Sequence, residues 1–94
     1  MRSLIINELL AIVAGRDGTF LVNRNDVFIG QSLEFYGEHG ELEGAFLKSL
    51  VKAGDHVIEV GANIGAYTVG LAKAVGARGR VDAYEPQPAC YALL

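Results

Sequence analysis

The chain has 94 residues, of which 51% are hydrophobic and 12 are glycine, and its net charge is −3. This length allows at most one domain, and the composition favours buried strands joined by tight turns over disorder. No run of like charges exceeds two residues and no apolar run reaches the ~20 residues of a membrane span, so neither a nucleic-acid partner nor a membrane is indicated. We therefore expect a small-molecule partner.

Cys90 is the only cysteine, so the sequence cannot form an internal disulfide. A cysteine-poor chain is typical of a reducing compartment, and Asn7 and Glu8 interrupt the apolar centre that a signal peptide would need. These features predict a cytoplasmic protein in which Cys90 has a packing role.

The first region, residues 1–37, is predicted to be an N-terminal extension. Two short β-prone runs, Gly18–Val22 and Val27–Ile29, flank the polar quartet Asn23–Asp26, which is rich in turn residues and predicts a β-hairpin. Leu4–Val13 could form a helix or a strand, because its apolar run does not distinguish between the two.

The second region, residues 38–94, alternates between helical and extended patterns. Gly54 is placed to cap the first of its helices. A strand–helix–strand unit of this length implies parallel pairing with a right-handed connection, and hence an α/β fold. The predicted elements are a helix Glu41–Lys52, a strand His56–Val60, a turn Gly61–Gly65, a helix Ala66–Val75, a strand Arg80–Tyr84 and a helix start at Ala89–Leu94.

The glycine turn after the first of these strands has the features of a ligand site. Ligands of open α/β sheets bind at the carboxyl ends of the strands, which is where Gly61–Gly65 lies. Gly61 and Gly65 allow a ligand to approach the backbone closely, and the following helix directs free N–H groups to the same place.

Two cofactor classes use such a turn. A dinucleotide favours Gly-x-Gly-x-x-Gly, whereas here the third position is Asn63, whose side chain would crowd the phosphates. Glu59, just before the turn, would repel a pyrophosphate but attract a sulfonium or an amino group. Electrostatics therefore favours S-adenosylmethionine over NAD(P), which stays the alternative.

Glu85 follows the second strand, about 20 residues after the turn, where an acidic residue commonly binds ribose hydroxyls. A glycine turn alone can be purely architectural, and a single acidic residue is often just a solvated loop residue. The combination of Glu59, Gly61, Gly65 and Glu85 at two adjacent strand ends favours a ribose-containing ligand.

Several segments resemble one known family. Gly54–Thr68, with its Gly-Ala-Asn-Ile-Gly, and Gly79–Pro88, with its Glu-Pro-Gln-Pro, are similar to the FkbM family of methyltransferases, and Tyr36–Glu43 resembles that family's lead-in to the first helix. The resemblance covers about residues 36–94. It implies a Rossmann-like class I methyltransferase fold that uses S-adenosylmethionine to methylate hydroxyl groups of sugars or natural products. It also implies a cofactor site in which Glu85 holds the ribose and the methionine side is lined by Glu59, Gly61, Ala62, Asn63 and Gly65.

Members of that family are more than twice as long as this chain. The resemblance therefore implies that residues 38–94 are the first half of the domain, and that the adenine contacts, the acceptor loops and any catalytic base lie elsewhere. We assign no catalytic residue and no metal site, and a non-catalytic fragment remains a third interpretation. We also expect self-association, because a sheet with one exposed apolar edge favours pairing with another chain.

Overall fold

The structure is a computed structural model that describes residues 2–94. Its first part is a three-stranded antiparallel sheet in the order β1-β2-β3, with Ala11 opposite Val22 and Val13 opposite Phe20. One face of this sheet is covered by helix α1, which contributes the buried Leu33. The elements are β1 (Arg2–Ile5), β2 (Leu10–Ala14), β3 (Thr19–Asn23) and α1 (Ile29–Tyr36).

The predicted hairpin is wrong in its second strand. β3 lies where the first β-prone run predicted it, but it pairs with β2 across the Gly15–Gly18 turn, and Val27–Ile29 does not form a strand. The reason is local, because the Asp26 carboxylate accepts hydrogen bonds from the N–H groups of Phe28 and Ile29 and so favours the start of α1. The ambiguous run Leu4–Val13 contributes to two strands, β1 and β2.

The second part has the predicted order of elements. β4 and β5 are parallel, with Val57 opposite Val81 and Val60 opposite Tyr84. This confirms the α/β class, with a parallel two-stranded sheet beside the antiparallel one. The elements are α2 (Glu41–Leu50), β4 (His56–Val60), α3 (Thr68–Val75), β5 (Arg80–Tyr84) and α4 (Pro88–Tyr91).

Two helix ends differ from the prediction. α2 ends at Leu50 with Val51 as its C-cap, so Gly54 does not cap it and instead donates its N–H to the carbonyl of Val75. α3 begins at Thr68 rather than at Ala66, because the glycine turn continues as non-helical chain through Tyr67.

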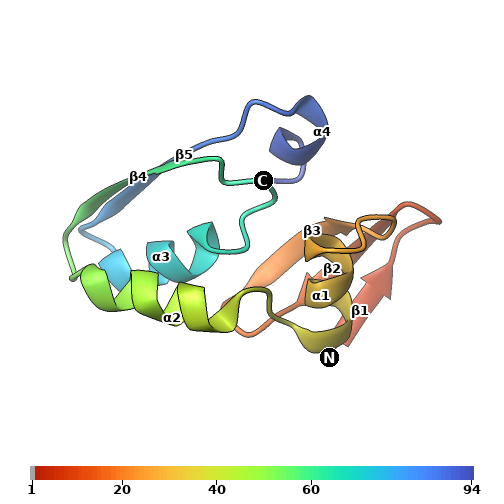
Figure 1. The fold of residues 1–94 in the computed structure, drawn as a ribbon, viewed down its shortest axis with the longest axis horizontal. Coiled ribbons are helices and arrows are strands. Elements are labelled where there is room, and N and C mark those ends of the chain that lie inside the picture. Colours follow the sequence, from red (N-terminus) through yellow and green to blue (C-terminus); the bar gives the residue numbers. More distant parts are fainter. Residues whose placement is uncertain (1) are drawn as a thin grey trace.

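Figure 1 shows the antiparallel sheet and α1 at one end of the molecule, and α2, α3, β4 and β5 at the other. The two parts share one core. Ile64 of the glycine turn is buried in the cluster formed by Ala11, Val13, Phe20, Val22 and Leu33. The N-terminal sheet therefore positions the turn that the sequence singled out.

The parallel sheet is covered on one side only. α3 packs on the face that carries Val57 and Val81, while Ile58 and Val60 on the other face are 64% and 82% exposed. Among residues 2–94, β4 and β5 pair only with each other. Within the same range, no helix has the length and apolar character needed to cross a membrane.

Candidate functional site

The glycine turn is held at the carboxyl ends of β4 and β5. The N–H groups of Gly61 and Ala62 both donate to the carbonyl of Tyr84, at 2.8 and 3.0 Å. The chain therefore leaves β4 directly beside the last residue of β5, and the two sequence motifs meet at one edge of the sheet.

Glu85 joins the two motifs. Its Oε1 accepts the N–H of Asn63 at 2.8 Å, and its Oε2 accepts the N–H of Gln87 at 2.9 Å. A carboxylate has about four acceptor positions, so each oxygen retains one for a further donor. Glu85 thus orders the turn and can still bind two hydroxyl groups.

The backbone N–H groups of residues 61–65 are all occupied. Besides the bonds of Gly61, Ala62 and Asn63, the N–H of Ile64 donates to Oδ1 of Asn63 at 2.9 Å and that of Gly65 donates to the carbonyl of Ala62 at 3.0 Å. Asn63 adopts a left-handed conformation with φ of 55°, which Asn tolerates better than most residues. A phosphate would find no free N–H in these five residues.

Glu59 lies on the α3 side of β4 and is half-buried. Its Oε1 accepts a hydrogen bond from Oγ1 of Thr68, the first residue of α3, at 2.5 Å. Among residues 2–94 its Oε2 has no hydrogen-bond partner. The carboxylate is therefore anchored with one oxygen available beside the turn.

The two glycines of the turn differ in the space around them. Gly61 has φ of 83°, and a Cβ built on it would meet no atom within 4 Å. At Gly65, with φ of 98°, a Cβ would lie 3.1 Å from Cδ1 of Leu94. Ala62 is buried and faces the protein interior. The open side of the turn is therefore at Gly61.

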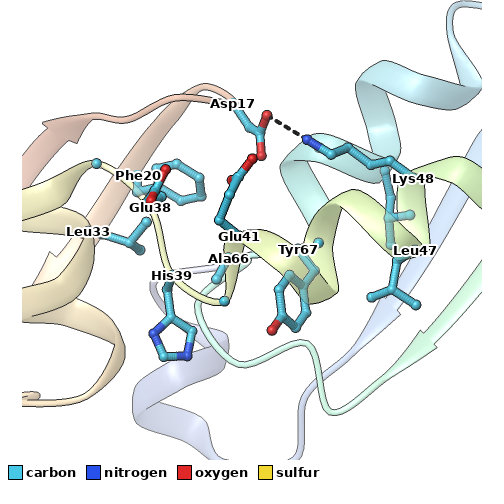
Figure 2. A pocket seen from close by; sticks show the side chains of 15 residues that line it. Asp17, Phe20, Leu33, Glu38, His39, Glu41, Leu47, Lys48, Ala66 and Tyr67 are labelled. Atoms are coloured by element: carbon cyan, nitrogen blue, oxygen red, sulfur yellow. Dashed lines mark hydrogen bonds and ion pairs between the residues drawn. The ribbon is translucent and has the colours of Figure 1, made fainter.

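A small, partly open cavity lies between the two parts of the molecule, and Figure 2 shows the side chains that line it. Its volume is about 10 Å³, which is close to the minimum for one water molecule. Asp17 of the β2–β3 turn pairs there with Lys48 of α2 at 3.1 Å. Arg16 of the same turn pairs with Glu38 and Glu41. These contacts join the two parts and leave no room for a ligand.

A larger, open pocket of about 330 Å³ lies beside the glycine turn. Asn63 lines it from the turn, Gln87 and Cys90 line it from the C-terminal segment, and Asp26 and Phe28 line it from the β3–α1 connection. Of these residues the sequence singled out Asn63 alone as a site residue. The β3–α1 connection carries no motif, and only the fold brings it to the turn.

Cys90 lines this pocket beside Gln87. Burial raises the pKa of its thiol, and the negative charges of Glu85 and Asp26 raise it further. The thiol also donates a hydrogen bond to Oε1 of Gln87 at 3.3 Å. A thiol in these surroundings stays protonated, which fits a packing role and argues against a nucleophile.

Comparisons of the chain with protein-family models, with curated proteins and with solved structures found no match. Within residues 2–94, no three His, Cys, Asp or Glu side chains are grouped so that they could hold a metal ion.

Proposed function

We propose that this chain is a cofactor-binding portion of an S-adenosylmethionine-dependent methyltransferase with a Rossmann-like arrangement of strands and helices. The observation that carries the proposal is the bond between Glu85 and the N–H of Asn63, because it joins the acidic end of β5 to the glycine turn after β4. The particular family that the motifs support is the FkbM methyltransferases.

The hydrogen bonding of the turn favours S-adenosylmethionine over a dinucleotide. A pyrophosphate is bound by free backbone N–H groups, and within the turn itself every N–H of residues 61–65 already has an acceptor, which leaves only those at the start of α3. The free oxygen of Glu59 adds negative charge that opposes a phosphate and suits the amino group or the sulfonium of a methionine moiety. NAD(P) is therefore the weaker alternative.

The residues present fit the cofactor in three respects. The space beside Gly61 can take the methionine chain. Glu59 offers a carboxylate oxygen for the amino group, and Glu85 retains acceptor positions for two ribose hydroxyls. When bound, S-adenosylmethionine supplies a methyl group for in-line transfer, here to a hydroxyl of a sugar or natural product, and the role of this chain is to fix the donor.

Calorimetry with S-adenosylhomocysteine and with NADH tests this proposal. We expect S-adenosylhomocysteine to bind and NADH to bind more weakly or not at all. Glu85→Ala removes both ribose acceptors, so the affinity for S-adenosylhomocysteine should fall about tenfold or more. Gly61→Val should lower it as well, because the side chain would occupy the open space at a φ of 83° that valine resists.

Glu8→Ala is the matched control, because Glu8 is an exposed acidic residue of the β1–β2 turn, outside the site. Circular dichroism of each variant separates loss of binding from loss of folding. Stronger binding of NADH would overturn the proposal. An affinity that is the same in both site variants would favour the interpretation as a non-catalytic fragment with an architectural turn.

A further inference from the structure

The open pocket beside the glycine turn is a candidate site for a second ligand. We name it the Asp26 pocket, and define it by Asn23, Asp26, Phe28, Asn63, Gln87 and Cys90. Its volume of about 330 Å³ is in the range of pockets that bind small ring compounds. Of the residues assigned to the proposed cofactor it includes Asn63 alone.

A carboxylate with a fixed orientation lines the pocket. Oδ1 of Asp26 accepts the N–H groups of Phe28 and Ile29 at 3.1 and 3.2 Å, which holds the carboxylate in place. Its Oδ2 has no hydrogen-bond partner within residues 2–94. Asp26 therefore offers one charged acceptor to a ligand that carries a hydrogen-bond donor.

Side-chain amides supply donors around the same pocket. Oδ1 of Asn23 accepts the N–H of Asn25, and Oδ1 of Asn63 accepts the N–H of Ile64, both at 2.9 Å. These bonds fix which end of each amide is the oxygen, so both NH₂ groups are left as donors. Gln87 likewise uses its oxygen, as the acceptor for the thiol of Cys90. None of the three NH₂ groups has an acceptor in the described part of the chain.

Much of the remaining lining is apolar. The ring of Phe28 is 77% exposed, and Ile29, Ile64 and Leu93 add aliphatic side chains. An exposed aromatic ring favours stacking against the flat face of a ligand. The lining residues, all within the described range, include no Lys or Arg, so an anionic group would meet Asp26 with no cation to compensate.

We propose that the Asp26 pocket binds a neutral, flat nitrogen heterocycle that carries an exocyclic amino group, such as the cytosine base of a nucleoside, as a ligand separate from the methyl donor. Such a base has two apolar faces and a polar edge that presents both donors and acceptors. Its face would stack on Phe28, its amino group would donate to Oδ2 of Asp26, and its ring nitrogen and carbonyl oxygen would accept from amide NH₂ groups.

The same groups disfavour other ligands. A nucleotide would bring a phosphate to a pocket that has a carboxylate and no cationic side chain. A hydrocarbon would leave Asp26 and the amides without partners. The proposed contacts do not involve Glu59, Gly61 or Glu85, so this site does not depend on the proposed function.

NMR titration of the intact chain with cytidine tests the proposal. We expect cytidine to shift the side-chain NH₂ resonances of Asn23, Asn63 and Gln87, with a dissociation constant of about 1–10 mM for so small a ligand. The NH₂ group of Asn7, which lies in the β1–β2 turn, should not shift and serves as the internal control. Methyl riboside, which has the sugar without the base, should cause no shift in any of them.

A matched pair of ligands tests the role of Asp26. Pyrimidin-2-one riboside differs from cytidine only by the missing amino group, and it should bind about tenfold more weakly. In Asp26→Asn this difference should fall to about twofold or less, because an NH₂ group takes the place of the free carboxylate oxygen. Asparagine can still accept the two N–H groups at the start of α1, so the variant keeps the local fold. An unchanged ratio between the two ligands in this variant would overturn the proposed contact.

Phe28→Ala should weaken the binding of cytidine about threefold or more, through loss of stacking. Phe35→Ala, at an exposed position of α1 outside the pocket, is its matched control. Equal effects of the two variants, no shift with cytidine, or equal shifts with methyl riboside would overturn the proposal. Tighter binding of cytidine monophosphate than of cytidine would overturn the neutral character of the ligand.

A second titration, in the presence of S-adenosylhomocysteine, shows whether the site is separate. Cytidine should cause the same shifts with and without this compound. Loss of the cytidine shifts would overturn a separate site and assign the pocket to the adenine of the methyl donor. If S-adenosylhomocysteine does not bind at all, the proposed function fails while the cytidine titration still decides the present proposal.

Discussion

At the scale of single residues, charged groups on the uncovered face of the parallel sheet compensate one another. Oδ2 of Asp82 lies 2.7 Å from Nε2 of His56, and its Oδ1 accepts the Nε–H of Arg80 at 2.7 Å. The hydrogen bond from Arg80 and then that from His56 hold the pKa of Asp82 below its usual value. The same bond to Asp82 raises the pKa of Arg80.

This contact predicts a pH-dependent effect of Asp82→Asn. A carboxyl whose folded pKa is lowered adds stability above its unfolded pKa of about 3.9, and this stability is lost as pH falls through the folded value. The variant should therefore melt at a lower temperature than the natural chain at neutral pH, and the difference should vanish in strong acid. The effect should be small, because the side chains of both partners, His56 and Arg80, are exposed.

Thermal melts of both proteins between about pH 7 and pH 2 measure this difference. Glu8→Gln, at an exposed position in the β1–β2 turn, should show no such trend. A difference that persists or grows towards acid pH would contradict the assigned pairing.

The residues of the candidate site illustrate what a sequence can reveal. Glu85 and the glycine turn were placed correctly at adjacent strand ends, because parallel strands bring their carboxyl ends to one edge. The use of the turn's N–H groups was not predictable, since it depends on the left-handed φ of Asn63 and on the direction of the Glu85 side chain. That Asp26 and Asn63 line the same pocket was not predictable, because it depends on how the two parts pack.

At the scale of elements, the β3–α1 connection is tightly packed around Gly30. A Cβ on Gly30, in the first turn of α1, would lie 2.3 Å from the carbonyl oxygen of Asn23 and 3.0 Å from Cβ of Asp26. Since the closer atom belongs to the backbone, it can move only if the connection moves.

Gly30→Ala is accordingly expected to destabilise the fold by roughly 1–3 kcal/mol, through overpacking. Gly44→Ala is the matched control, because Gly44 lies inside α2 and its Cβ would meet only the ring of Tyr67, at 3.4 Å. That variant should be neutral, or more stable by up to ~1 kcal/mol, from helix propensity. Urea unfolding midpoints measure both effects, and equal midpoints for the two variants would contradict the packing at Gly30.

The same connection explains why the predicted hairpin failed. Val27, Phe28 and Ile29 have high β-propensity, yet the carboxylate of Asp26 binds two of their N–H groups at the start of a helix. The strand that pairs with β3 is β2, which begins within the run Leu4–Val13. The pattern of that run did not distinguish a helix from a strand. The α/β unit was predictable to within a few residues, because its strands and helices have clear periods and are separated by glycine turns.

At the scale of the whole molecule, the two sheets differ in how well other elements cover them. The antiparallel sheet, α1 and the glycine turn share a buried core, whereas the parallel sheet is covered on one face only. Ile58, Val60 and Tyr84 form an exposed apolar surface on its other face, and neither outer edge of the sheet is paired within residues 2–94. Leu42, Phe46 and Leu50 add an apolar stripe along α2.

These exposed surfaces support the prediction that the isolated chain self-associates, because unpaired strand edges beside apolar side chains favour pairing with another chain. Light scattering across a range of concentrations should give a mass above that of the monomer. Val60→Lys places a charge beside the free edge of β4 and should shift the mass towards the monomer. Leu42→Lys changes α2 instead, so a similar shift there would assign the contact to the helix stripe. A monodisperse monomer for the unmodified chain at every concentration would rule the prediction out.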